Sequence, residues 1–226
     1  MDEKIPFGGT IRFKQLMAEL TENLSKLSKL TTEMIDKGIQ ALVEDDEELY
    51  KGLKKDLEKI HTIFNDLDSS AVSSLALHQP FARDLRYIIS SIKIGHEIHR
   101  CAHDAVHIAR SSEFVDRRKS KFNGCITDIG KLGQLALNMF KESTNAFLNK
   151  KVLDFTKWQK SDDEIDTKHE EIIKDISSIM CQNPDWIRAG VSLILATRYI
   201  ERIADHACNI VEESKYVVTS ERGKIE

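Results

Sequence analysis

The chain has 226 residues, of which 31% are charged and 41% hydrophobic, with only three prolines and ten glycines. Its formal net charge is −4, and acidic and basic residues are spread along the whole length, which does not favour nucleic-acid binding. Few helix breakers combined with many Ala, Glu, Lys, Leu and Ile residues predict an all-α fold built from long helices.

The sequence has neither closely spaced cysteine pairs nor long apolar segments, and both features bear on where the protein works in the cell. The four cysteines are far apart and form no CxxC pair, which is typical of a reducing compartment rather than of a disulfide framework. No apolar run approaches the ~20 residues that cross a bilayer, and the N-terminus has no apolar signal-peptide core. We therefore expect a cytoplasmic protein without direct membrane insertion.

Three helices are predicted in the first half of the chain. Apolar residues recur at steps of three and four, as expected for helices that bury one face. Pro80 ends the second helix, because the residue before a proline is pushed out of the α region. The first nine residues are expected to form a loose lead-in and residues 112–119 a linker. The predicted helices span residues 10–43, 47–75 and 81–111.

The same pattern begins again after the linker. Met34 aligns with Met139 at a shift of 105 residues, and neighbouring apolar positions follow. Asn183 followed by Pro184 is a typical start for the last helix. The repeat predicts six helices arranged as two three-helix bundles, one over residues 10–112 and the other over residues 120–218. In the second half the predicted helices span residues 120–150, 152–181 and 186–218.

A stripe of histidines marks the third helix. Steps of three, four and four residues keep these side chains within about 80° of arc on one helix face. Neutral imidazoles at i and i+4 are good ligands for zinc, iron, nickel or copper. The other interpretations are ordinary structural histidines or a proton-responsive face. The stripe consists of His96, His99, His103 and His107, and His61 on the second helix is a candidate further ligand.

The second half carries carboxylates where the first carries imidazoles. Glu201 and Asp205 lie one turn apart on the sixth helix, at the positions that correspond to the first-half histidines. Asp162 and Asp166 lie along the fifth helix, and the periodicity of the fourth helix predicts that Glu142 points inward. Such a cluster is costly without a cation, and oxygen ligands suit magnesium, manganese, calcium or iron. The alternative is neutralisation at the surface by Lys160, Lys168, Arg198 or Arg202.

Two segments of the chain resemble a known family, the PhoU-like phosphate-uptake regulators. One is Gln79 to Arg86 (QPFARDLR), which leads into the third helix. The other is Glu201 to Ile210 (ERIADHACNI), which is similar to that family's E/DxxxD motif. Together with the doubled three-helix plan, the resemblance extends over about residues 13 to 218.

The resemblance implies a function as well as a fold. Members of this family are often dimeric and bind metal ions through the E/DxxxD carboxylates, which here are Glu201 and Asp205. They act in the cytoplasm as negative regulators of phosphate uptake and phosphate-starvation signalling, and link the ATPase subunit of the phosphate ABC transporter to a sensor histidine kinase. The first-half counterparts in this chain, His99 and His103, depart from the family's pattern.

Enzymatic functions find less support in the sequence. No nucleophile with its base, Gly-rich phosphate loop or dinucleotide fingerprint is recognisable, so we expect an adaptor rather than an enzyme. A ferritin-like di-metal oxidase or metal store is the alternative, because Glu58 and His61 form an ExxH pair, with Asp166 and His169 as a looser analogue. That architecture requires both pairs to converge in one four-helix core. A helical scaffold without any metal is the third possibility.

Overall fold

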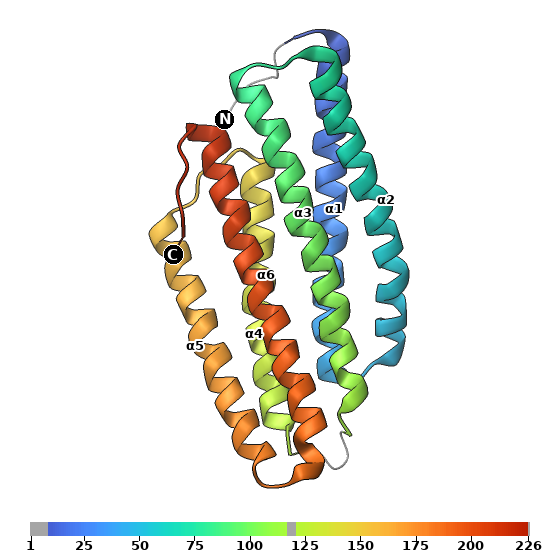
Figure 1. The fold of residues 1–226 in the computed structure, drawn as a ribbon, viewed down its shortest axis with the longest axis vertical. Helices are drawn as coiled ribbons and strands as arrows, with labels where there is room; N and C mark the ends of the chain where they lie inside the picture. The colour runs from blue at the N-terminus through green and yellow to red at the C-terminus, as the bar shows by residue number, and fades with distance from the viewer. Residues whose placement is uncertain (1–8, 117–120, 226) are drawn as a thin grey trace.

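The computed structural model describes residues 9–116 and 121–225, and in these ranges the chain is all-α, as predicted (Figure 1). No strand occurs in the described part of the chain. The long helices are α1 (Ile11–Glu44), α2 (Glu47–His78), α3 (Ala82–Arg110), α4 (Asn123–Leu148), α5 (Phe155–Met180) and α6 (Ile187–Thr219). Of two short 3-10 helices, η1 (Ser111–Phe114) follows α3 directly and η2 (Pro184–Trp186) leads directly into α6.

Side-chain caps set where several of these helices begin. Asp46 accepts hydrogen bonds from the backbone N–H groups of the first turn of α2, and Asp154 does the same for α5. Asn183 and Pro184, which the sequence predicts to start the last helix, start η2 instead: Asn183 caps it, and α6 follows directly from Ile187. These caps satisfy N–H groups that have no partner within the helix.

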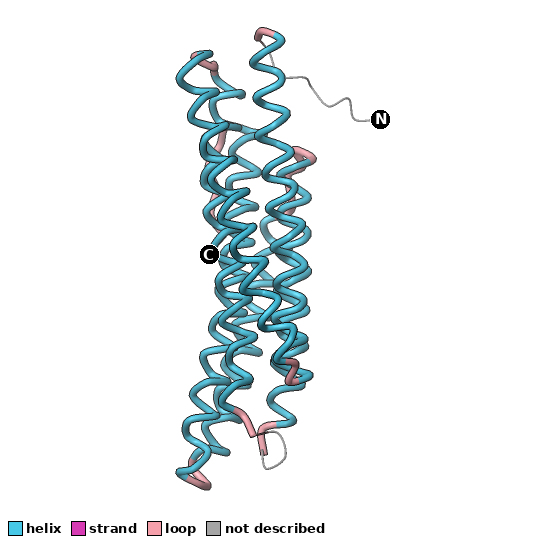
Figure 2. Tube along the Cα trace, turned by 90° about the vertical axis from the view of Figure 1, so that its right-hand side faces the viewer, coloured by secondary structure: helices cyan, strands magenta, loops and turns pink. Residues whose placement is uncertain are grey.

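The six helices form two groups of three that lie side by side. Within the first group α2 packs on α1 and α3, and within the second α5 packs on α4 and α6. The two groups meet through α1 against α4 and α3 against α6, so α2 and α5 occupy the opposite edges of the molecule (Figure 1). All helices run along the long axis (Figure 2), and one hydrophobic core extends through both groups.

A glycine allows a close contact between α1 and α3. A Cβ atom at Gly38 of α1 would lie 2.5 Å from the carbonyl oxygen of Ala105 on α3, well inside van der Waals contact. Only glycine therefore permits the two backbones to come this close.

The linker predicted between the two halves differs from the structure in its first residues. Ser111 to Phe114 form a packed 3-10 turn instead of an open linker, and the Ser192 hydroxyl donates a hydrogen bond to the Ser111 carbonyl at 3.1 Å. Most of the predicted lead-in (1–8), the rest of the linker (117–119) and the predicted start of the fourth helix at 120 lie outside the described residues. In the described ranges, no helix has the length and apolarity that a membrane crossing requires.

Candidate metal centres

Three of the predicted histidines come together between α2 and α3. His61 projects from α2, while His99 and His103 lie one turn apart on α3, and one nitrogen from each ring lies within 4.8 Å of the other two. His61 Nδ1 and His99 Nε2 are hydrogen-bonded at 2.9 Å. Among the described residues, this is the one group of three or more His, Cys, Asp or Glu ligand atoms gathered so closely.

The remaining histidines of the stripe face other partners. His96 meets the edge of Phe64, with ring centroids 4.8 Å apart. His107 stacks on Tyr199 of α6 at 4.9 Å. The four histidines of the stripe therefore do not share one site, because α2 packs along one part of the stripe and α6 contacts another part.

The environment of His99 and His103 favours the neutral form of both rings. Burial, followed by the neighbouring His103, His61 and His96, lowers the pKa of His99 to about 4. Burial and the charge of His61 also lower the pKa of His103. Phe64 stacks on the His99 ring at 4.8 Å and limits its rotation. Neutral imidazoles offer lone pairs to a metal ion.

The acidic residues of the second half form a second electrostatic group, between α5 and α6. Burial, followed by the negative charge of Asp205, raises the pKa of Glu201 to about 7. Burial also raises the pKa values of Asp162 and Asp205, and the charge of Asp166 adds to both shifts. Each carboxylate therefore disfavours ionisation of its neighbours.

Two buried atoms in this region lack a hydrogen-bond partner. They are Glu201 Oε2 on α6 and His169 Nδ1 on α5. The thiol of Cys208 contacts Asp162 Oδ1 at 3.5 Å, and burial together with Asp162 raises the pKa of that thiol. Unpartnered oxygen atoms within a group of carboxylates are suited to a hard cation.

Counter-charges neutralise this group only in part. Arg198 forms an ion pair with Glu201, as the sequence predicts. Arg202 instead pairs with Asp104 of α3 at 3.4 Å, and Lys168 pairs with Glu164 at 3.6 Å. The predicted inward position of Glu142 is wrong: its side chain is exposed on α4, because the buried arc of that helix is occupied by Met139, Phe140, Ser143 and Thr144.

The arrangement required by a ferritin-like centre is not formed. Glu58 and His61 lie on α2, and Asp166 and His169 lie on α5. These two helices occupy opposite edges and do not contact each other within the described chain. The two pairs therefore do not converge in one four-helix core.

A partly buried polar link between the two halves was not predicted from the sequence. His206 Nδ1 of α6 contacts Glu97 Oε2 of α3 at 2.5 Å, and Asn209 donates to the same oxygen at 3.2 Å. Burial opposes ionisation of Glu97, but the hydrogen bond and charge of His206, together with Asn209 and Arg100, outweigh it and lower the pKa of Glu97. Burial raises the pKa of Asp104 to about 6, although Arg202 beside it acts in the opposite direction.

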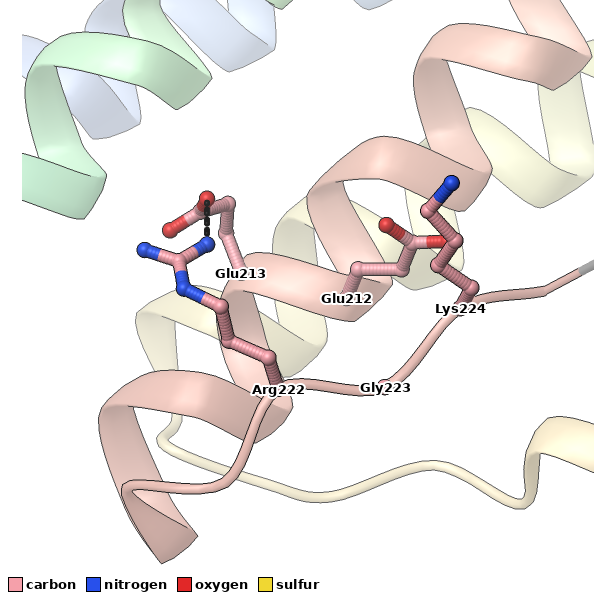
Figure 3. A pocket seen from close by; sticks show the side chains of 5 residues that line it. All are labelled: Glu212, Glu213, Arg222, Gly223 and Lys224. Atoms are coloured by element: carbon pink, nitrogen blue, oxygen red, sulfur yellow. Dashed lines mark hydrogen bonds and ion pairs between the residues drawn. The ribbon is translucent and has the colours of Figure 1, made fainter.

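The C-terminal segment adds an ionic contact to the end of α6. Figure 3 shows the Arg222 side chain reaching towards Glu213 at a cavity of about 240 Å³, with Glu212 and Lys224 at its other side. Glu213 also accepts hydrogen bonds from Lys93 at 2.6 Å and from Ser90 at 2.7 Å. Burial alone would raise the pKa of Glu213, yet these partners lower it. Two of the charged groups that border the cavity, Glu213 and Arg222, therefore already pair with each other.

Known proteins resemble this chain along almost its whole length. A family model described as the PhoU domain matches twice, at residues 24–112 and 129–214. A relative from Methanothermobacter thermautotrophicus, named phosphate-specific transport system accessory protein PhoU homolog 1, is 24% identical over 98% of this chain and 100% of its own. A Pseudomonas putida protein of the same description is 28% identical, over 92% of this chain and 80% of its own.

Solved structures share the fold. PhoU from Pseudomonas aeruginosa superposes with a TM-score of 0.86 at 24% identity, covering 92% of this chain and 100% of that one. The phosphate transport system regulatory protein PhoU from Streptococcus pneumoniae gives a TM-score of 0.84 at 23% identity, with coverage of 94% and 99%.

Proposed function

The chain belongs to the PhoU family, and from that premise we propose that it is an accessory protein of a phosphate transport system that negatively regulates phosphate uptake and phosphate-starvation signalling. The observation that carries this proposal is the double match to the PhoU domain, together with relatives named for the same role over nearly the whole chain. We place the protein in the cytoplasm and regard it as an adaptor rather than an enzyme.

Its partners, in this proposal, are the ATPase subunit of the phosphate ABC transporter, a sensor histidine kinase and a second copy of the chain. An adaptor needs long, rigid faces more than a reactive centre. Six long helices around one core provide such faces, and exposed apolar side chains remain on several of them. They include Val72 and Leu77 on α2 and Val191 and Leu195 on α6.

Metal binding in the second half is part of the proposal. Glu201 and Asp205 would be the ligands on α6, with Asp162 and Asp166 available from α5. Support comes from the unpartnered Glu201 Oε2 and from the raised pKa values of three of these carboxyl groups, which a cation would relieve. Oxygen donors suit iron, manganese or magnesium. Bound metal would hold α5 against α6 and so fix the shape of the surface that these two helices offer to a partner.

The regulatory role is tested by disrupting the gene in its own host and supplying phosphate in excess. A negative regulator predicts continued phosphate uptake and expression of a phosphate-starvation reporter at least several-fold above the intact strain. Wild-type protein restores repression, whereas the Glu201→Gln/Asp205→Asn double variant is expected to restore less. Glu142→Gln, which changes an exposed acid on α4, serves as the matched control.

Metal content and partner binding complete the experiment. Elemental analysis of the purified proteins should find iron, manganese or magnesium in the wild type and the Glu142 control, and a lower content in the double variant. Tagged protein should retain the transporter ATPase subunit or the kinase from host extracts. Unchanged uptake and reporter expression in the disrupted strain, with neither partner retained, would refute the regulatory role.

A further inference from the structure

The three histidines between α2 and α3 differ in kind from the carboxylates of the second half. The three ligand nitrogens lie within 4.8 Å of one another, and they come from two neighbouring helices. One pair, His61 Nδ1 and His99 Nε2, is 2.9 Å apart. The three nitrogens already lie close together, so a ligand set exists without any rearrangement of the backbone.

The spacing is close to that of a tetrahedral metal site. Zinc–nitrogen bonds of about 2.0–2.1 Å place neighbouring ligand nitrogens roughly 3.4 Å apart. The hydrogen-bonded pair at 2.9 Å must separate slightly, and the wider pairs, up to 4.8 Å, must approach. Rotation of the imidazole side chains covers these differences. His61 is exposed, so water can reach a fourth coordination position.

The ligand group consists of imidazole nitrogens. Among the described residues, no Asp, Glu or Cys ligand atom joins His61, His99 and His103 in this group. Zinc, cobalt, nickel and copper bind imidazole well, whereas magnesium, calcium and manganese prefer oxygen. Phe64 packs against His99 from the same side of α2 and holds that ring in place.

We propose that His61, His99 and His103 form a binding site for a borderline divalent transition ion, with Zn²⁺ as the ion bound and one coordination position left to water. This site is separate from the carboxylates of α5 and α6, and it stands whether or not the regulatory role does. The ion links α2, an edge helix, to α3 at the centre of the molecule (Figure 1).

Cobalt provides a direct test, because tetrahedral Co²⁺ has visible absorption bands that octahedral Co²⁺ lacks in comparable strength. Untagged protein is stripped with a chelator and titrated with Co²⁺, and Zn²⁺ is then added. The wild type should develop the tetrahedral bands at one equivalent, and Zn²⁺ should remove them because it binds more tightly than Co²⁺. His61→Gln and His103→Gln should weaken Co²⁺ binding by more than about 100-fold, beyond the loss typical of outer-shell changes.

Two controls separate this site from its neighbours. His107→Gln removes a histidine of the same stripe that stacks on Tyr199, and it should bind Co²⁺ like the wild type. The Glu201→Gln/Asp205→Asn variant should also keep the bands, even if it fails to regulate uptake. Circular dichroism verifies folding, and His61, an exposed residue, gives the decisive variant if His103→Gln unfolds.

The proposal is overturned if the wild type shows no tetrahedral bands in excess Co²⁺. It is equally overturned if the His61→Gln protein, folded, keeps them at full strength.

Discussion

At the scale of single residues, Glu201 makes the second-half acidic group sensitive to pH. Its pKa lies at about 7 in the folded protein, above the ordinary 4.5, because of burial and of Asp205. Between these values the folded state holds a proton that the unfolded chain has released. The contribution of Glu201 to the free energy of unfolding therefore decreases as the pH rises from 4.5 to 7.

Replacing Glu201 by glutamine removes this titration. In chelator, Glu201→Gln should unfold at nearly the wild-type temperature at pH 5, where Glu201 is protonated. At pH 8 the variant should be the more stable protein, by on the order of a few degrees. The measurement is thermal unfolding by circular dichroism at both pH values, and added Mn²⁺ should favour the wild type instead. A difference that is the same at pH 5 and pH 8 would show that Glu201 titrates normally.

The individual site residues were predictable to the extent that they share a helix. His99 and His103 are one turn apart on α3, so their common face follows from helical geometry. The approach of His61 also followed, because consecutive antiparallel helices pack together. The contact between Glu97 and His206 joins helices from different halves, and its existence depends on packing that no local pattern encodes. For Glu142, the periodicity predicted its position around the axis of α4, but it did not show which side of that helix is buried.

At the scale of the elements, the contact between α1 and α3 depends on Gly38. A methyl group there would meet the Ala105 carbonyl oxygen at 2.5 Å, so the two helices would have to separate. Gly38→Ala should lower the free energy of unfolding by about 1–3 kcal/mol, the usual cost of overpacking, even though alanine favours a helix. Urea unfolding monitored by circular dichroism measures the change.

Gly52 on α2 is the matched control for this substitution. It is exposed, and a Cβ atom there meets nothing within 4 Å. Gly52→Ala should therefore stabilise the protein by about 0.5–1 kcal/mol through helix propensity alone. A Gly38→Ala protein as stable as Gly52→Ala would mean that α1 and α3 separate at no cost.

Helix positions were predicted within a few residues because each apolar stripe is long. The observed helix ends differ from the predicted ones where a proline or a capping side chain, rather than the apolar stripe, sets the end. Helix α2 continues to His78, since Pro80 restricts only the residue directly before it. Helix α5 begins at Phe155 and not at residue 152, because the Asp154 side chain caps it.

At the scale of the whole molecule, the two halves share one hydrophobic core and should unfold together. Both tryptophans, Trp158 and Trp186, lie in the second half, whereas circular dichroism reports helices of both halves. In chelator, urea unfolding should give the same midpoint by tryptophan fluorescence and by circular dichroism. Leu53 is fully buried on α2, and Leu53→Ala should lower the free energy of unfolding by about 2–5 kcal/mol. Both urea midpoints should therefore fall together.

Independent halves would behave differently. The Leu53→Ala substitution would then lower only part of the circular dichroism signal and leave the fluorescence transition unchanged. The internal repeat predicted two three-helix groups, but it did not predict that α1, α3, α4 and α6 would form a common centre. A repeat shows what is duplicated, while the interface between the copies depends on long-range packing.

The position of α2 and α5 at the two edges also affects how a bound ion would leave either candidate centre. Each edge helix contacts only two long helices, so a brief outward movement of one leaves the four central helices packed. His61 lies on one edge helix, and Asp162 and Asp166 lie on the other. Each centre thus takes its ligands from one central helix and one edge helix, and an outward movement of the edge helix separates them. A bound ion must lose its bonds to one of the two helices before it leaves, so we expect its release to follow the rate at which the edge helix moves outward.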